Sequence, residues 1–182
     1  MTESGNLDGD AEMGAIVEWV EGAPQEQREA HDQALIWSLA TERQDGRVRR
    51  ARMDFMAEHE RTLARGVYDD ESAEPPRRMQ SEIVLMFTAA RQLLRALKSF
   101  DNNHRPRQGL DHDRVQLLRN ALEHWDDPTG SALTKLAAQG VDPKDNRWRS
   151  DGSGIVGGID DRELEAWARA VFDDIRTWDP WY

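Results

Sequence analysis

The chain has 182 residues, of which 24 are Lys or Arg and 35 are Asp or Glu, so its formal net charge is −11. This length suits one domain with a sizeable core, and 38% hydrophobic with 32% charged residues is typical of a helical protein with a strongly solvated surface. The absence of cysteine excludes disulfides, thiolate metal ligands and cysteine nucleophiles, and the acidic balance argues against a broad, non-specific grip on nucleic acid.

The N-terminal region shows no sign of membrane insertion or export. No apolar run approaches the roughly 20 residues that span a bilayer, and residues 1–14 lack the basic and apolar regions of a secretory signal. We therefore expect a cytoplasmic protein without membrane contact. Residues 1–10 are polar and acidic, which predicts a disordered tail, and residues 11–182 are expected to form a single helical domain.

Helical periodicity begins soon after this tail. A short amphipathic helix is expected over residues 11–20, where the following Gly-Ala-Pro sequence ends it. A longer helical region is expected over residues 25–67, with Gly46 as its break. Residues 68–76 carry an acidic run and a pair of prolines, so we expect a loop there.

The segment over residues 79–100 is the most strongly helical in the chain. Its apolar residues recur at steps of three and four, which places them on one wide face of a helix. We expect this helix to lie at the centre of the molecule, with an apolar stripe formed by Ile83, Val84, Met86, Phe87, Ala90, Leu93, Leu94 and Leu97.

A second amphipathic helix is expected over residues 111–127, with Asp111 as its N-cap and Pro128 at its end. Its expected buried stripe consists of Val115, Leu118, Leu122 and Trp125. A short helix follows over residues 131–139 and stops at Gly140.

The C-terminal part completes the predicted fold. Residues 141–158 are expected to form an elaborated loop or a small hairpin. The last helix begins with Asp160 and Glu163 at the spacing of a capping box and runs to about Thr177. It should bury Leu164, Trp167, Val171, Phe172 and Ile175. The sequence as a whole therefore predicts an all-α helical bundle.

The sequence RNALEH, residues 119–124, places three polar groups where they can act together. Asn120 and His124 are four residues apart and share a face of the predicted helix, and the long side chain of Arg119 reaches the same region. Histidine titrates near neutral pH and can move a proton to or from an RNA hydroxyl, while a guanidinium stabilises charge that develops on phosphate. One helix supplies too few groups for both acid and base, so we expect a two-fold dimer to bring two copies together.

RNALEH resembles the R-N-x-x-x-H signature of the HEPN superfamily, the small helical ribonuclease domains of bacterial toxins, abortive-infection proteins and RNA-guided CRISPR effectors. The setting is similar too, because a long apolar helix and a polar loop precede the motif. The resemblance covers about residues 79–177, and its specific part is the six-residue motif.

This resemblance implies a metal-independent endoribonuclease that needs no cofactor, leaves 2′,3′-cyclic phosphate ends and acts as a toxin or in phage defence. It implies that Arg119 and His124 form the catalytic pair and that Asn120 orients them. The implied partners are RNA, a second copy of the chain, and an antitoxin or other regulatory protein.

Two features depart from the HEPN pattern. Some HEPN toxins have a tyrosine two residues after the histidine that a nucleotidyltransferase antitoxin modifies, whereas this chain has Asp126 there, so this form of regulation is not expected. Glu123 can pair with Arg119 at a spacing of four residues and compete with a phosphate for it. The alternative, which the net charge of −11 favours, is a catalytically inactive HEPN-like module that binds RNA or a protein, and a purely structural subunit is a third interpretation.

Arginines also cluster on the first long helix. They predict a weak RNA-binding surface formed by Arg47, Arg49, Arg50 and Arg52, with Arg43, Arg77 and Arg78 nearby. Such a run is more often a solvated helix face.

Three further patterns receive structural interpretations. GSGIVG, residues 152–157, matches a dinucleotide-binding pattern, but no buried strand precedes it, so its glycines are expected in turns. The acidic pairs at helix ends are expected to act as caps rather than as metal ligands. The aromatic residues of the C-terminal sequence TWDPWY are expected to lie against the bundle.

Overall fold

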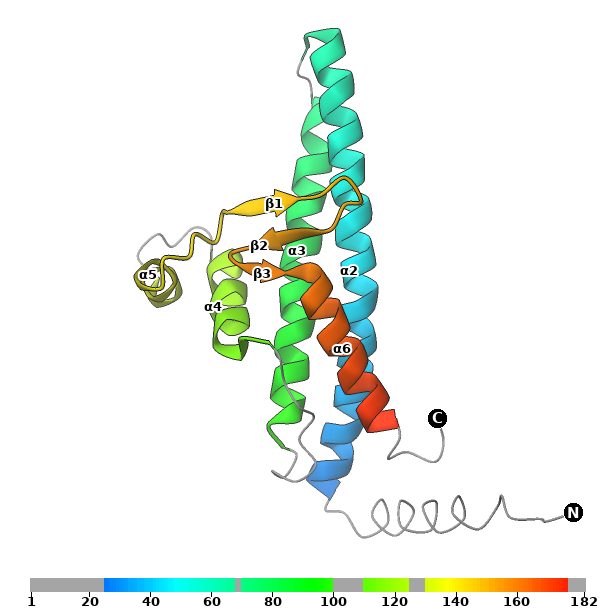
Figure 1. Cartoon of the computed structure of the whole chain (residues 1–182), viewed down its shortest axis with the longest axis vertical. Coiled ribbons are helices and arrows are strands. Elements are labelled where there is room, and N and C mark those ends of the chain that lie inside the picture. Colours follow the sequence, from blue (N-terminus) through cyan, green and yellow to red (C-terminus); the bar gives the residue numbers. More distant parts are fainter. Residues whose placement is uncertain (1–24, 68–69, 100–109, 125–129, 177–182) are drawn as a thin grey trace, which may run out of the picture.

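The computed structural model describes residues 25–67, 70–99, 110–124 and 130–176. Within these ranges it contains five helices and one small antiparallel sheet, so the predicted helical bundle with an elaborated loop or small hairpin near residues 141–158 is confirmed (Figure 1). The predicted N-terminal tail, the first short helix and the C-terminal aromatic residues lie outside the described ranges. None of the described helices is both long and apolar enough to cross a membrane.

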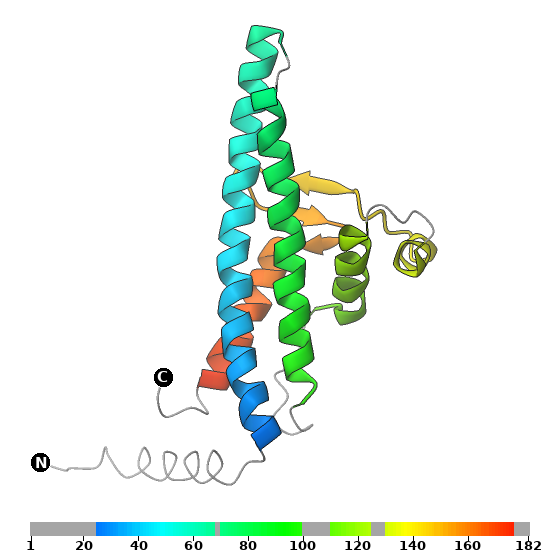
Figure 2. The same ribbon diagram turned by 180° about the vertical axis from the view of Figure 1, so that it is seen from behind.

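Two long helices form an antiparallel hairpin along the whole molecule. α2 spans Gln25–Arg65 and α3 spans Asp70–Leu97, and views from both sides show their shared tip extending beyond the other elements (Figures 1 and 2). α3 turns its apolar face to the core as predicted, while Val84 at the edge of that face is half-buried. The fully buried members of the face are Ile83, Met86, Phe87, Ala90, Leu93 and Leu97.

α2 continues through Gly46, so the helix break predicted there is wrong. A Cβ at Gly46 would have no neighbour within 4 Å, so the glycine is not required by a close approach. Asp45 and Val48 on either side of it are buried against the neighbouring helices. This packing outweighs the roughly 1 kcal/mol that a glycine costs in the middle of a helix.

The loop predicted at residues 68–76 is also wrong over most of its length, because α3 runs through Pro75 and Pro76. Each proline lacks the N–H that a helix bonds to the carbonyl four residues earlier, which is why the sequence signal favoured a loop. The start of α3 is instead held by α2, where the Thr62 hydroxyl donates a 3.3 Å hydrogen bond to the hydroxyl of buried Ser72. Packing within the hairpin thus overrides the two prolines.

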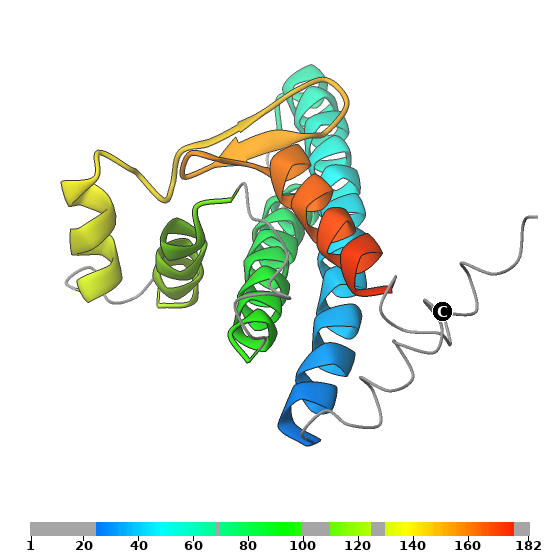
Figure 3. The same cartoon turned by 60° about the horizontal axis from the view of Figure 1, so that its bottom comes forward.

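The helices α5 (Ser131–Ala138), α4 (His112–Glu123), α3 and α2 lie in a row, each against the next (Figure 3). Asp111 is the N-cap of α4 as predicted, since its Oδ1 accepts a 3.0 Å hydrogen bond from the Arg114 backbone N–H. α5 stops at Gly140 as predicted; the glycine N–H donates to the Ala137 carbonyl at 2.9 Å with a positive φ of 69°.

The buried face of α4 differs slightly from its prediction. Val115 and Leu118 are buried as expected, whereas Leu122 is half-buried and Ala121 takes its place in the core. Trp125 lies outside the described residues.

A three-stranded antiparallel sheet links the α4–α5 side of the molecule to the start of α6 (Figure 1). Its strands are β1 (Asn146–Trp148), β2 (Gly154–Val156) and β3 (Ile159–Asp160), in that order. At the β2–β3 turn Gly157 has a φ of +53°, and a Cβ there would collide with the Leu118 side chain of α4. Gly152 and Gly157 therefore serve turns, as predicted, whereas Gly154 lies within β2.

α6 spans Asp161–Arg176 and packs on α2. Asp160 caps its first turn, because Asp160 Oδ1 accepts a 3.0 Å hydrogen bond from the Arg162 N–H. Phe172 is half-buried, and the other four predicted core residues are buried, namely Leu164, Trp167, Val171 and Ile175.

Candidate functional site

The RNALEH sequence forms the last five residues of α4 and its C-cap. α4 ends at Glu123, and His124 leaves the helical conformation with φ −106° and ψ 46°, although its N–H still donates to the Asn120 carbonyl at 3.1 Å. The prediction that the motif lies wholly inside a helix is therefore wrong for its last residue.

Arg119 is held by two neighbours on its own helix. Its Nη1 donates to the Asn120 Oδ1 at 3.1 Å, and its Nη2 donates to the Glu123 Oε1 at 2.5 Å. Nη1 also pairs with the second Glu123 oxygen, so the guanidinium meets the carboxylate through both terminal nitrogens. The Arg119 side chain is only 17% exposed, and its Nε is buried without a hydrogen-bond partner.

His124 stands at the exposed edge of the same cluster. Its side chain is 67% exposed, and its Nε2 lies 3.8 Å from a Glu123 oxygen. Glu123 thus lies between the predicted catalytic arginine and histidine. A carboxylate in this position offsets the positive charge of Arg119.

Two hollows flank this end of α4. A hollow of about 280 Å³ is lined by Asn120 and His124 of α4, with Gly130, Ser131, Ala132 and Leu133 of the facing segment. A larger and more apolar hollow of about 750 Å³ is lined by α3, by Leu122 and Glu123 of α4, and by Lys144. Arg119 lines neither hollow. The structure therefore brings Asn120 and His124 to one surface depression, while Arg119 contacts Asn120 and Glu123 without lining that depression.

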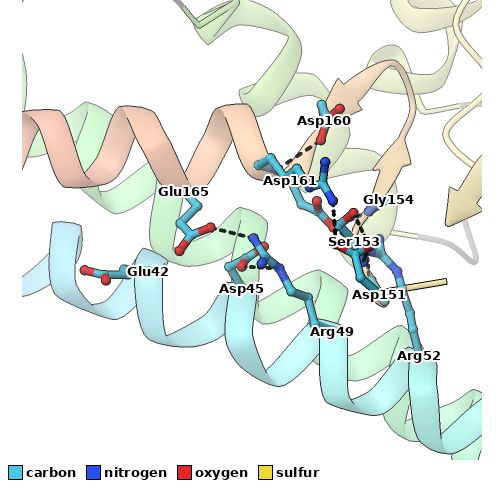
Figure 4. A network of polar contacts seen from close by, with 12 residues as sticks. Glu42, Asp45, Arg49, Arg52, Asp151, Ser153, Gly154, Asp160, Asp161 and Glu165 are labelled. Atoms are coloured by element: carbon cyan, nitrogen blue, oxygen red, sulfur yellow. Dashed lines mark hydrogen bonds and ion pairs between the residues drawn. The ribbon is translucent and has the colours of Figure 1, made fainter. Parts of the chain in front are cut away.

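The predicted arginine surface is divided by the structure. Arg52 is completely buried, donates to the Gly152 carbonyl at 3.0 Å and pairs with the Asp161 carboxylate (Figure 4). Arg49 pairs with Asp45 at 2.8 Å and with Glu165 of α6 at 2.5 Å. Arg49 and Arg52 therefore join α2 to α6 and to the turn before β2.

The remaining arginines of the cluster face solvent. Arg47 and Arg50 are exposed, as is Arg43 upstream, and none of them has an ion pair to a described residue. They line a third hollow of about 640 Å³, whose lining also includes Gly46 and the acidic residues Glu42, Asp45 and Glu165. These three arginine side chains are the ones available to an anionic ligand.

Asp45 is a residue of this network that the sequence did not single out. It is only 2% exposed, and its Oδ1 accepts no hydrogen bond. Burial raises the pKa of the Asp45 carboxyl to about 7, even though Arg49 opposes the shift. The spacing of four residues between Asp45 and Arg49 is a signal from which this pair could have been predicted, but the burial of Asp45 depends on α6, which is distant in sequence.

The acidic residues before α6 are engaged with arginines. Arg149 donates to both oxygens of Asp160, at 3.3 and 2.7 Å, and these hydrogen bonds hold the pKa of Asp160 below its ordinary value. Hydrogen bonds from Ser153 and Arg162 likewise lower the pKa of Asp151. Within the described part of the chain no three His, Cys, Asp or Glu side chains are grouped to hold a metal ion.

Comparisons of the chain with protein-family models, curated proteins and solved structures found no match. The resemblance to HEPN domains therefore rests on the residues of the motif, and the catalytic roles of Arg119, Asn120 and His124 stay predictions.

Proposed function

We propose that this chain is a metal-independent endoribonuclease of the HEPN type that acts as a toxin or an anti-phage defence effector. The observation that carries the proposal is the polar cluster at the end of α4. Arg119 is hydrogen-bonded to Asn120, and Asn120 shares a hollow with the exposed His124. These three groups are of the types that cleavage of RNA without a metal requires.

In the proposed reaction the 2′-oxygen of a ribose attacks the adjacent phosphorus. His124 takes the proton of the 2′-hydroxyl, and Arg119 stabilises the negative charge that gathers on the phosphate oxygens. The bond from phosphorus to the 5′-oxygen then breaks, and the 5′-oxygen receives a proton from a second acid. The products are a 2′,3′-cyclic phosphate and a 5′-hydroxyl end.

The second acid is proposed to come from a second copy of the chain. One α4 end supplies a single histidine, and a two-fold dimer would bring two of these ends together. The 67% exposure of the His124 side chain leaves it open to such a partner. An antitoxin or other regulatory protein would act by covering the same end of α4.

A catalytically inactive module is the second candidate, and the Arg119–Glu123 pair favours it. A guanidinium whose two terminal nitrogens already meet a carboxylate is not free to bind phosphate. In this function the end of α4 would bind RNA or a protein without cleaving it.

The deciding experiment is cleavage of a fluorescent single-stranded RNA in EDTA by the wild type, His124→Ala and Arg119→Ala. We expect the wild type to leave 2′,3′-cyclic phosphate ends, identified by mass spectrometry, and each variant to lose at least about a hundredfold in rate. Circular dichroism and thermal melting establish that each variant is folded.

His59→Ala is the matched control, because His59 is an exposed histidine on α2. It should cleave at the wild-type rate. An inactive wild type, or His124→Ala that cleaves as fast as His59→Ala, would refute the catalytic proposal. Retained RNA binding in that case would favour the inactive module.

A further inference from the structure

We propose that Glu123 is a displaceable counter-ion that occupies the phosphate-binding edge of Arg119 until RNA replaces it. This inference rests on the proposed function and adds to it a residue that sets the affinity of the site. It follows from the contacts of Glu123, from its position on α4 and from the hollow beside it.

The contacts show what Glu123 blocks. Its two oxygens meet both terminal nitrogens of Arg119, which is the bidentate geometry that an arginine also uses for a phosphate. The remaining hydrogen bond of these nitrogens goes to Asn120. Phosphate and Glu123 therefore compete for the same two donors.

The position of Glu123 makes its displacement easy. It is the last residue of α4, where the helix dipole disfavours a negative charge, and the last turn of α4 contains no basic residue. The pair also has the arginine before the glutamate, which is the weaker order for charges four residues apart on a helix. Its side chain is 41% exposed, so water screens the pair on one side.

A second cation is available to the displaced carboxylate. Glu123 lines the larger hollow together with Lys144, whose side chain is exposed and has no ion pair to a described residue. We infer that Glu123 turns from Arg119 toward Lys144 when a phosphate binds. Arg119 then faces the RNA while the carboxylate keeps a positive partner.

The test measures binding separately from cleavage. The probe is a fluorescein-labelled single-stranded RNA with 2′-O-methyl groups throughout, which cannot form the cyclic phosphate, and fluorescence anisotropy gives its dissociation constant. Glu123→Gln should bind it about three- to tenfold more tightly than the wild type. Asp113→Asn is the matched control, because it removes one exposed negative charge from the same helix without contacting Arg119.

Two double variants identify the mechanism. In the Arg119→Ala background, Glu123→Gln should raise the affinity for RNA no more than Asp113→Asn does. The Arg119 nitrogens for which Glu123 and phosphate compete are absent from this variant. Lys144→Gln should weaken binding about twofold in the wild type and have no effect in Glu123→Gln. Where Arg119→Ala does not fold, Arg119→Gln replaces it, since it keeps part of the buried stem.

The outcomes separate this inference from the proposed function. Equal affinities of Glu123→Gln and Asp113→Asn overturn the inference, whether or not the wild type cleaves unmodified RNA. If Glu123→Gln still raises the affinity for RNA in the Arg119→Ala background, the inference is overturned as well. The increase then comes from removing a negative charge and not from freeing Arg119. An inactive wild type with a tighter Glu123→Gln would refute catalysis while retaining the competition for Arg119.

Discussion

At the scale of single residues, Asp45 links the stability of the protein to pH. Its pKa is about 7 in the folded protein against an ordinary value of 3.8, because burial penalises the carboxylate. Between about pH 4 and pH 7 the folded protein therefore holds a proton that the unfolded chain releases. The free energy of unfolding should fall as the pH rises through this window.

Asp45→Asn should remove this contribution, because an amide resembles the protonated acid and does not titrate. Urea unfolding at pH 5 and pH 8 measures it, and we expect the wild type to lose roughly 1–3 kcal/mol more than the variant between these values. Solvent in the adjoining hollow screens the Asp45 charge, so the loss in the free energy of unfolding should be smaller than 1.4 kcal/mol for each unit of the pKa difference. Asp54→Asn, at an exposed position of the same helix, should retain the wild-type pH dependence. A pH dependence unchanged in Asp45→Asn would contradict the raised pKa.

Arg52 is the residue on which the joint between α2 and the β2–α6 segment depends most. It is completely buried, and its partner Asp161 also accepts a 2.7 Å hydrogen bond from the Gly154 N–H. Arg52→Met would leave the buried Asp161 carboxylate without its counter-charge. We expect a loss of about 3–5 kcal/mol in the free energy of unfolding, measured in urea.

Adding Asp161→Asn to Arg52→Met should recover part of this loss, because the uncompensated charge disappears. Arg50→Met serves as the control, since Arg50 is exposed on the same helix and should change stability by less than about 0.5 kcal/mol. If Arg52→Met and Arg50→Met were equally stable, the buried pair would not be what holds this joint together.

At the scale of elements, the predictions from the sequence were most accurate where the structure depends on interactions within one helix. The Asp111 cap, the stop at Gly140 and the apolar face of α3 follow from side chains and backbone within one element. The two errors in α2 and α3 have the opposite origin. Gly46 and the proline pair are local signals against a helix, and contacts between distant segments override them.

Two glycines allow this distinction to be tested. Gly46→Ala should raise the free energy of unfolding by about 0.5–1 kcal/mol, because Gly46 is helical and a Cβ there meets nothing within 4 Å. Gly157→Ala should lower it by more than that, because its φ is positive and the Cβ would collide with Leu118. Urea unfolding of both variants checks this, and a destabilised Gly46→Ala would show that the helix needs the glycine.

At the scale of the whole molecule, the residues of the candidate site could be predicted from the sequence, but their contacts and their exposure could not. The sequence placed Arg119, Asn120 and His124 near each other, and it raised Glu123 as a competitor. Glu123 pairs with Arg119, while the His124 side chain is exposed. Both features depend on the end of α4 at Glu123. The contacts that bury Arg52 and half-bury Arg49 come from α6 and the preceding turn, which lie 100 or more positions away, so no local pattern separates these two arginines from Arg47 and Arg50.

The net charge of −11 repels RNA, so we expect RNA to bind only at surfaces that are locally positive. Arg43, Arg47 and Arg50 are separated by four and three residues, which places them on one exposed face of α2. If this face binds RNA, replacing all three by Gln should weaken binding. It should also reduce the slope of log affinity against log salt by about one for each phosphate that the protein no longer neutralises.

The control for this triple variant must lose the same three positive charges from the net charge of −11. Exposed arginines elsewhere on α2 and α3 provide it through the changes Arg28→Gln, Arg61→Gln and Arg95→Gln. Anisotropy titrations from about 50 to 200 mM salt measure both slopes. A smaller slope in the first triple alone identifies the α2 face as an RNA-binding surface. Equal slopes mean that Arg43, Arg47 and Arg50 only solvate the helix, and that RNA reaches the end of α4 without their help.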